Sequence, residues 1–223
     1  MDKLFLSFLG KPNSGKSTLI SDLVDYYDDK HNIGVFSGSN LIYEIEKKSK
    51  LWKELEPIIK SGKNIPQHIV IELLERSLKN SREEIIVLDN IMPNMEAIDH
   101  FIGQGQFSID TLVSLLPADD LCIERSGKRL ICDICRHPYR VEHDLYEVIG
   151  TPCAKDDGGV LVRRSNDELI EKRLKDFRKL TLPVIEYFAN TEISTLNLLP
   201  THRTTREEIR EQASDFLSEN FGL

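Results

Sequence analysis

The chain has 223 residues, which suffices for one domain with inserted lobes and for a core that needs no disulfide bonds. Lys and Arg number 29 against 37 Asp and Glu, so the formal net charge is −8. This acidic balance argues against broad binding to nucleic acid, and 40% hydrophobic residues argue against disorder. The sequence has no membrane-spanning stretch, and its first apolar run is too short for a signal peptide, so we expect a cytoplasmic protein with no membrane partner.

The first part of the chain alternates strand and helix patterns. Apolar spacing predicts, in chain order, a buried strand, a helix, a second strand and two further helices: residues 4–9, 17–27, 33–36, 41–60 and 67–78. Pro57 is expected to break the first of the two later helices near its end. Pro66 lies just before the second.

The same alternation continues to the end of the chain around one interruption. A third strand, a fourth apolar region around Pro117, a helix, a last strand and a closing helix are predicted at residues 84–89, 109–123, 168–188, 192–199 and 206–216. Pro183 is expected to kink or divide the 168–188 helix. Residues 129–162 are rich in Cys, Gly and Pro without a helical period, which predicts a small inserted lobe. Strands that alternate with helices predict an α/β fold with a parallel sheet.

Residues 10–17 read Gly-Lys-Pro-Asn-Ser-Gly-Lys-Ser and match the phosphate-loop pattern G-x-x-x-x-G-K-[ST] in full. Two glycines let the backbone curl so that its N–H groups face an anion, and the helix that follows adds its positive end. Lys16 is then placed to reach the outer phosphates, and Ser17 a magnesium ion. The residues expected to bind ATP are Gly10, Pro12, Asn13, Ser14, Gly15, Lys16, Ser17 and Thr18.

Asp89 ends the apolar strand of residues 85–88. An acidic residue at the carboxyl end of a buried strand beside a phosphate loop is typical of the carboxylate on the magnesium side of a phosphoryl-transfer site. A turn or helix-cap aspartate is the alternative interpretation.

The inserted lobe carries a pattern of metal ligands. Cys132 and Cys135 form a Cys-x-x-Cys pair, and Cys153 follows after 17 residues. The second short turn, residues 153–156, also offers two ligands. Two short ligand turns at this spacing are what a tetrahedral structural zinc site requires. By spacing, Asp156 is the best fourth ligand, and Asp157 and His137 compete with it. Cys122 lies in an apolar run and is interpreted as a buried small side chain.

The order of these features resembles that of adenylate kinases and related nucleoside monophosphate kinases, over nearly the whole chain. The likeness is closest to the long form, whose lid binds zinc through three cysteines and an aspartate. Besides the cysteine set, the segments that carry the resemblance are residues 10–18, 61–66, 126–129, 173–174 and 181–184. The resemblance implies a P-loop kinase fold with a core at 1–36, 67–128 and 163–223, an acceptor lobe at 37–66 and a zinc-binding lid at 129–162.

The resemblance also implies an activity and the residues that perform it. A kinase of this family moves the γ-phosphoryl group of ATP-Mg to AMP or a related nucleoside monophosphate, and we expect a monomer whose partners are nucleotides. The cofactors implied are Mg²⁺ and a structural Zn²⁺. The implied catalytic residues are Lys16, Lys128, Arg164, Arg173 and Asp89.

The sequence departs from the family pattern mainly on the acceptor side. Tyr43 and Asn94 stand where the family has phosphate-binding arginines, and Glu124 stands where an arginine stacks on the donor base. Neither Tyr nor Asn can reproduce the charge of a bidentate arginine. Lysines of the acceptor lobe could replace them, although a solvated helix face is their commoner role: Lys47, Lys48, Lys50, Lys53, Lys60 and Lys63. A catalytically weak or inactive ATP/ADP-binding module, and a P-loop kinase with a non-nucleotide acceptor, are the alternatives.

Overall fold

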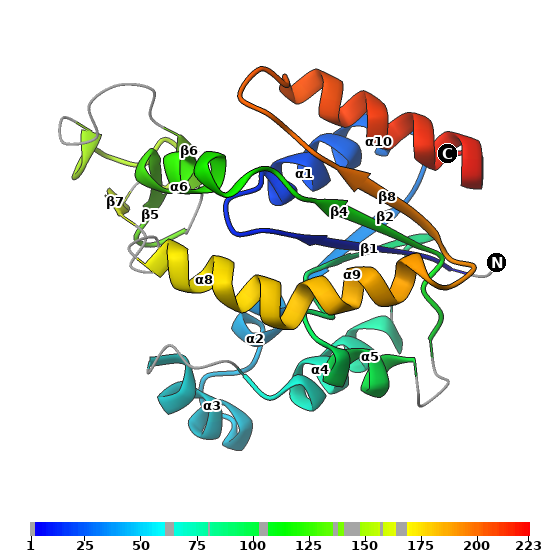
Figure 1. Cartoon of the computed structure of the whole chain (residues 1–223). Coiled ribbons are helices and arrows are strands. Elements are labelled where there is room, and N and C mark those ends of the chain that lie inside the picture. Colours follow the sequence, from blue (N-terminus) through cyan, green and yellow to red (C-terminus); the bar gives the residue numbers. More distant parts are fainter. Residues whose placement is uncertain are drawn as a thin grey trace.

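Five parallel strands form the centre of the protein (Figure 1). The computed structural model describes residues 3–60, 65–79, 81–102, 107–135, 138–140, 148–156, 158–163 and 169–223. Within these ranges the large sheet has the order β2-β3-β1-β4-β8, and all its pairs are parallel. Its strands are β1 (Leu4–Gly10), β2 (Ile33–Ser37), β3 (Ile85–Asp89), β4 (Thr111–Leu115) and β8 (Ser194–Leu198). The predicted α/β fold with a parallel sheet is therefore confirmed.

Helices cover both faces of this sheet, with α1 and α10 on one side and α4, α5 and α9 on the other (Figure 1). The helices described are α1 (Lys16–Tyr27), α2 (Gly38–Tyr43), α3 (Lys50–Lys60), α4 (Gln67–Lys79), α5 (Met95–Phe101), α6 (Asp119–Gly127), α8 (Ile170–Asp176), α9 (Leu182–Ala189) and α10 (Arg206–Phe221). Because helices cover both faces, the central strands are apolar on both sides, which is why they appear in the sequence as continuous apolar runs.

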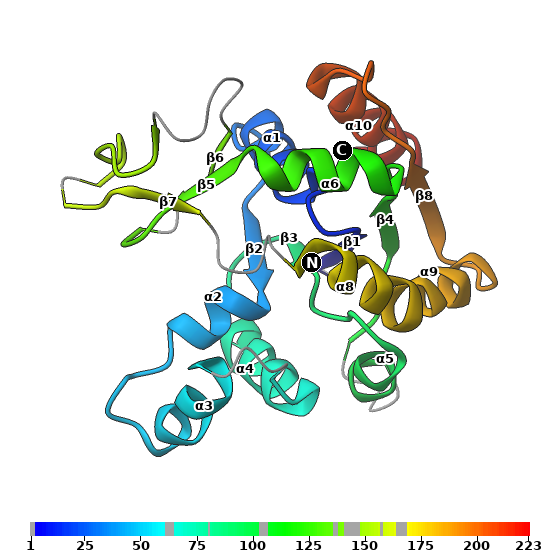
Figure 2. The same cartoon turned by 60° about the vertical axis from the view of Figure 1, so that its left-hand side comes forward.

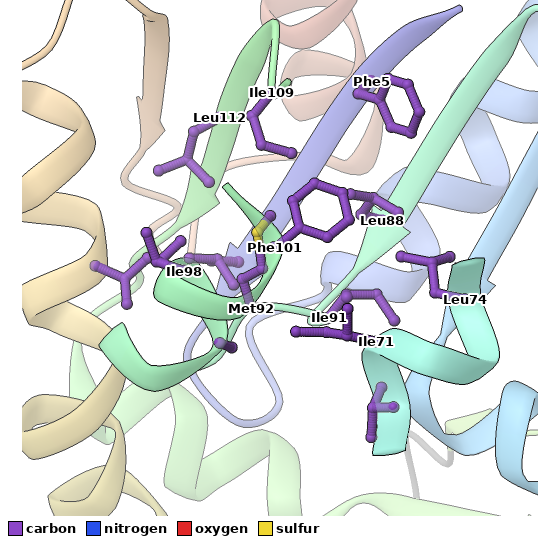
Figure 3. Packing of buried hydrophobic residues seen from close by; sticks show 14 of the residues in the cluster. Phe5, Ile71, Leu74, Leu88, Ile91, Met92, Ile98, Phe101, Ile109 and Leu112 are labelled. Carbon is purple, nitrogen blue, oxygen red and sulfur yellow. The ribbon is translucent and has the colours of Figure 1, made fainter. Parts of the chain in front are cut away.

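Strand β1 shows how the two halves of the core are divided. Leu6 and Phe8 pack on the face of α1 and α10, and Phe5 and Leu9 pack on the opposite face. This alternation is the period of two that a pleated strand imposes. On the second face, Phe5 contacts Phe101 of α5 edge to face, with the ring centroids 6.4 Å apart (Figure 3). Packing on both faces of the sheet therefore fixes the position of β1, the strand that leads into the following loop.

The helix predicted at residues 41–60 is divided in the structure. Helix α2 ends at Tyr43, and α3 begins at Lys50. The expectation that Pro57 breaks the helix near its end was wrong, because α3 continues through it to Lys60. A proline removes only one backbone donor, and Leu55, 1% exposed, anchors this helix by burial. The closing helix runs to Phe221, beyond the predicted end, and stops where Gly222 takes a left-handed φ of 70°.

Pro183 divides the long helix after the lobe, as predicted. A π-helical turn, Phe177–Thr181, separates α8 from α9, and Pro183 is in the first turn of α9. The proline has no N–H for the carbonyl four residues earlier, and one wider turn accommodates the mismatch. The hydroxyl of Thr181 donates to the carbonyl of Pro93 at 2.8 Å, which ties this turn to the segment after β3.

Two insertions leave the main sheet at the carboxyl ends of its strands (Figure 2). Helices α2 and α3 follow β2. After β4 and α6 comes a small antiparallel sheet of order β6-β5-β7, formed by β5 (Arg129–Cys132), β6 (Pro138–Arg140) and β7 (Leu161–Arg163). The insertions overlap residues 37–66 and 129–162, whose roles as acceptor lobe and lid stay predictions. No helix in the described ranges is both long and apolar enough to cross a membrane.

Candidate functional site

The loop between β1 and α1 has a backbone that only particular residues allow. Gly15 begins α1 with φ 100°, and Asn13 has φ 59°, so both are in the left-handed region. A Cβ on Gly10 would lie 2.8 Å from the Ser14 hydroxyl and 3.2 Å from the Leu115 carbonyl oxygen. The N–H of Ser14 donates to the Lys11 carbonyl at 3.1 Å, which closes the curl. The glycines of the sequence pattern are therefore required by the geometry.

Two polar atoms inside this loop have no hydrogen-bond partner within the described part of the chain. They are the Ser14 hydroxyl oxygen and the Asn13 side-chain nitrogen, and both are buried. Buried polar atoms are almost always hydrogen-bonded, so atoms left without a partner mark a place where a ligand can supply one. An anion held by a curled loop at a helix N-terminus fits these donors.

Lys16 and Asp89 form an ion pair at the mouth of the loop. Their side chains are 13% and 17% exposed. Asp89 ends β3 opposite Phe8 of β1, so the parallel register brings it beside the loop. Burial and the charge of nearby Arg129 lower the pKa of Lys16 to about 7, while contact with the Asp89 carboxylate acts in the opposite direction. The carboxylate of Asp89 faces Lys16 at the mouth of the loop, and its magnesium role stays a prediction.

Two arginines that the sequence analysis did not select lie against the loop, Arg125 of α6 and Arg129 at the start of β5. Arg125 Nη1 donates to the Ser14 carbonyl at 2.7 Å, and Arg129 Nη1 donates to the Asn13 side-chain oxygen at 3.1 Å. Lys128, which was predicted to act here, instead donates to Glu124 at 2.6 Å. Helix α6 ends at Gly127 and β5 begins at Arg129, so no helical spacing relates the two arginines and no such spacing in the sequence identifies them.

The start of α6 is also attached to the loop. Lys11 Nζ donates to Asp119 at 2.7 Å and to the Pro117 carbonyl at 2.8 Å. Arg178 of the π turn forms a second ion pair with Asp119. Hydrogen bonds from Lys11 and Arg178 hold the pKa of Asp119 below its usual range despite the opposing effect of desolvation. The loop, α6 and the π turn are thus joined through one carboxylate.

The structure describes only one of the two other predicted catalytic arginines. Arg173 is on α8, half-buried. Arg164 lies outside the described residues, so its predicted role stays a prediction.

On the acceptor side, Asn94 is engaged within its own helix. Its side-chain oxygen accepts the N–H of Ala97 at 2.9 Å and caps α5. The side chain of Tyr43 lies outside the described part of the structure. Of the acceptor-lobe lysines, Lys47, Lys48, Lys50 and Lys53 are exposed, and Lys60 and Lys63 have no described side chain. The described lysines thus have the solvated placement that is common for such residues.

Three cysteines converge in the small sheet. The sulfurs of Cys132, Cys135 and Cys153 all lie within 4.8 Å of one another. Backbone N–H groups of Ile134 and Cys135 point at the Cys132 sulfur, at 3.4 and 3.3 Å. Such donors stabilise thiolates, the form in which cysteine binds metal. A Cβ on Gly159 would collide with the Cys132 sulfur, so the glycine there lets the chain pass close to the cluster.

The fourth ligand is not among the described atoms that converge. Asp156 Oδ1 accepts the N–H groups of Gly158 and Gly159 at 2.9 and 3.0 Å, and Asp156 is not part of the three-sulfur cluster. His137 and Asp157 lie outside the described residues. Burial acts to raise the pKa of Cys153, but hydrogen bonds from the Tyr139 hydroxyl and the Lys155 N–H outweigh it and lower the pKa to about 7.

Comparison with known proteins adds to this geometry. A model of the adenylate kinase family matches residues 8–193. The chain is 31% identical over 195 residues to the adenylate kinase of Thermodesulfovibrio yellowstonii, an alignment that covers 84% of this chain and 88% of that protein. It is 29% identical to the adenylate kinase of Thermococcus kodakarensis, over 80% of each chain. For the adenylate kinase of Alkaliphilus oremlandii the identity is 27%, over 83% of this chain and 86% of that one.

Proposed function

The chain belongs to the adenylate kinase family, and we propose that the loop between β1 and α1 is where it holds the phosphates of ATP-Mg. Members of this family are ATP-dependent nucleoside monophosphate kinases, and this chain transfers the γ-phosphoryl group of ATP to a nucleoside monophosphate. An inactive nucleotide-binding module is not favoured. The observation that carries the proposed site is the curled loop itself, with Lys16 and Asp89 at its mouth and, within it, polar atoms that have no partner among the described residues.

The ion pair between Lys16 and Asp89 has a specific role in this proposal. Anionic phosphate oxygens attract the Lys16 ammonium more strongly than one carboxylate does, so ATP draws Lys16 away from Asp89. Asp89 and the Ser17 hydroxyl are then available to hold Mg²⁺, which would neutralise charge on the phosphates. Lys16, Arg164 and Arg173 are the cations proposed to stabilise the charge of the transferring group, and Lys128 joins them only by leaving its pair with Glu124. In this scheme residues 37–66 receive the acceptor, and residues 129–162 close over the site and exclude water.

Binding of ATP at pH 8 is expected to take up about one proton per site. The pKa of Lys16 is about 7 without nucleotide, so its amine is mostly neutral at pH 8. Phosphates favour the charged ammonium and raise this pKa, and the amine therefore gains a proton as ATP binds. Calorimetry in buffers of different ionisation enthalpy measures this uptake. The uptake should fall toward zero at pH 6, where Lys16 is already charged. Equal uptake at both pH values would contradict the assignment to Lys16.

The acceptor is the part of the function that needs direct measurement. We expect ADP formation from ATP-Mg with at least one of AMP, CMP, UMP, GMP and their deoxy forms. With Asn94 occupied as a helix cap and no arginine at position 43, the value of kcat/KM should be low for an acceptor held only by exposed lysines. A coupled assay over this panel names the acceptor. Binding of ATP without turnover of any acceptor would support the inactive-module alternative.

We further propose that zinc occupies the three-cysteine cluster, with Asp156, Asp157 or His137 as the fourth ligand. Three converging sulfurs with N–H donors around them fit a closed structural site. Reduced cysteines of this kind fit a reducing compartment such as the cytoplasm. We propose that the enzyme acts as a monomer, which light scattering in solution tests.

A further inference from the structure

We propose that Tyr139 is a positioning residue of the metal-binding lobe. Its hydroxyl donates to the Cys153 sulfur, holds that sulfur in place for the metal, and so sets how tightly the lobe binds zinc. This inference rests on the proposed zinc site, which it deepens by adding a residue that is not itself a ligand.

Strand β6 brings the Tyr139 ring onto the face of the small sheet that carries the cysteine cluster. In the antiparallel register Tyr139 lies opposite Leu130 of β5, and Cys132 follows Leu130 by two residues. Residues directly opposite each other, and residues two apart along a strand, share one face of a sheet. The ring accordingly packs against the buried cluster of Leu130, Cys132, Cys153 and Leu161. This packing fixes where the hydroxyl of the phenol lies.

The Tyr139 oxygen contacts the turn that carries Cys153 at two points. It lies 3.1 Å from the Cys153 sulfur, and it accepts the N–H of Ala154 at 3.2 Å. A metal-bound cysteine is a thiolate without a proton, so in that state the hydroxyl is the donor and the sulfur the acceptor. The Ala154 N–H occupies an acceptor position of the oxygen, which leaves the hydroxyl proton available for the sulfur. One phenol thus holds both the sulfur and the backbone beside it.

The sulfurs of Cys132 and Cys153 differ in where their hydrogen bonds come from. Cys132 accepts two backbone N–H groups of its own turn. Cys153 accepts the backbone N–H of Lys155 at 3.3 Å, and the Tyr139 hydroxyl comes from another strand. A side-chain donor can be removed by substitution while the backbone is kept, so the contribution of this contact to metal binding can be measured directly.

The hydrogen bond favours the metal-bound state over the metal-free state. A bond to an ionised acceptor is stronger than a bond to a neutral one, so the hydroxyl of Tyr139 binds the thiolate form of Cys153 more strongly than the thiol form. It also limits the orientations of the sulfur, which lowers the entropy that metal binding costs. Residues that hold metal ligands in this way typically contribute about 10- to 100-fold to metal affinity.

The test compares Y139F, Y139L and Y27F, each in the full chain, by competition for Zn²⁺ with a chromophoric chelator. Y139F removes the hydroxyl and keeps the ring, and it should weaken zinc binding about 10- to 100-fold. Y139L removes the ring as well and should bind zinc no more tightly than Y139F. Y27F is the matched control, because Tyr27 is buried and its hydroxyl donates to the Ser214 carbonyl at 3.3 Å, outside the lobe. Its zinc affinity should equal that of the wild type.

Two further measurements separate this role from packing alone. With Co²⁺ in place of zinc, the sulfur-to-cobalt charge-transfer band should move to longer wavelength in Y139F, because a thiolate that loses a hydrogen bond is a stronger electron donor. A role limited to packing would leave the band in place, since phenylalanine keeps the ring. Thermal unfolding in excess chelator should be nearly the same for Y139F and the wild type, because water can replace the hydroxyl at the exposed Ala154 N–H.

Wild-type zinc affinity in Y139F, or an unmoved cobalt band, would overturn the role of Tyr139 and leave the zinc site standing. A loss of zinc affinity in Y27F as large as that in Y139F would also overturn it, because the effect would then not be specific to the lobe. A wild-type protein that binds no zinc would overturn the zinc site itself, and the role of Tyr139 with it.

Discussion

Lys16→Met is expected to reduce kcat on the order of 10³-fold. The ammonium of Lys16 is the buried cation at the mouth of the phosphate loop, in a position where water cannot take its place. In such a site a fixed charge stabilises developing negative charge far more than it would in solution. Methionine preserves the apolar stem but has no charge. A coupled assay of ADP formation under saturating ATP-Mg measures the loss.

The matched control is Lys30→Met, which removes a lysine from an exposed position just after α1. Its activity should equal that of the wild type, because an exposed charge far from the loop is screened by solvent. Circular dichroism and thermal unfolding of both variants check that the fold is retained. If Lys16→Met kept more than about a tenth of the wild-type kcat, Lys16 would not be the main phosphate-binding cation.

The phosphate loop could be predicted from the sequence because its geometry is local. Gly10 and Gly15 are required by a close contact and by a left-handed φ, and Lys16 follows from the helix that begins there. Asp89 could be predicted for a similar reason, since the end of a buried parallel strand lies at one edge of the sheet. These features depend on the residues themselves and on the strands that precede them, not on distant packing.

Arg125 and Arg129 could not be assigned with the same certainty. The contact of Arg125 depends on which face of α6 is directed at the loop, and Asp119 at the start of that helix is held by Lys11 and Arg178. The contact of Arg129 depends on where the chain leaves α6 and begins β5. Family resemblance favoured Lys128, whereas the structure brings Arg129 to the loop. Pro57 was misjudged in the same way, because burial of the helix outweighed the local preference.

On the acceptor side, the sequence pattern shows which arginines are missing but not which residue binds the acceptor phosphate. Asn94 was noted as the loss of an arginine, and the structure gives its side chain a different task, the cap of α5. That task depends only on the local turn. A cation for the acceptor phosphate must therefore come from another segment, and sequence spacing alone cannot identify which one.

Cys132→Ser is expected to abolish stoichiometric metal binding and to lower kcat by about 10-fold or more, because a lid that does not hold its shape cannot exclude water from the site. The Cys132 sulfur is buried and accepts two backbone N–H groups, which hold it within the cluster. Metal content after dialysis, measured by atomic emission, should fall from one equivalent of zinc per chain to a small fraction. A chelator strong enough to strip the wild type should reproduce the loss of kcat.

Cys122→Ala provides the control, because Cys122 is also buried but packs with Ile170 and Leu174 outside the cluster. It should keep one equivalent of zinc and near wild-type kcat. Single replacement of Asp156, Asp157 and His137 by alanine then identifies the fourth ligand as the one whose loss weakens zinc binding most. Full metal content in Cys132→Ser, or none in the wild type, would contradict the zinc site. Structural zinc contributes directly to the stability of the segment that binds it. The metal would therefore control Arg129 as well, since β5 carries Cys132 at one end and the loop-bound arginine at the other.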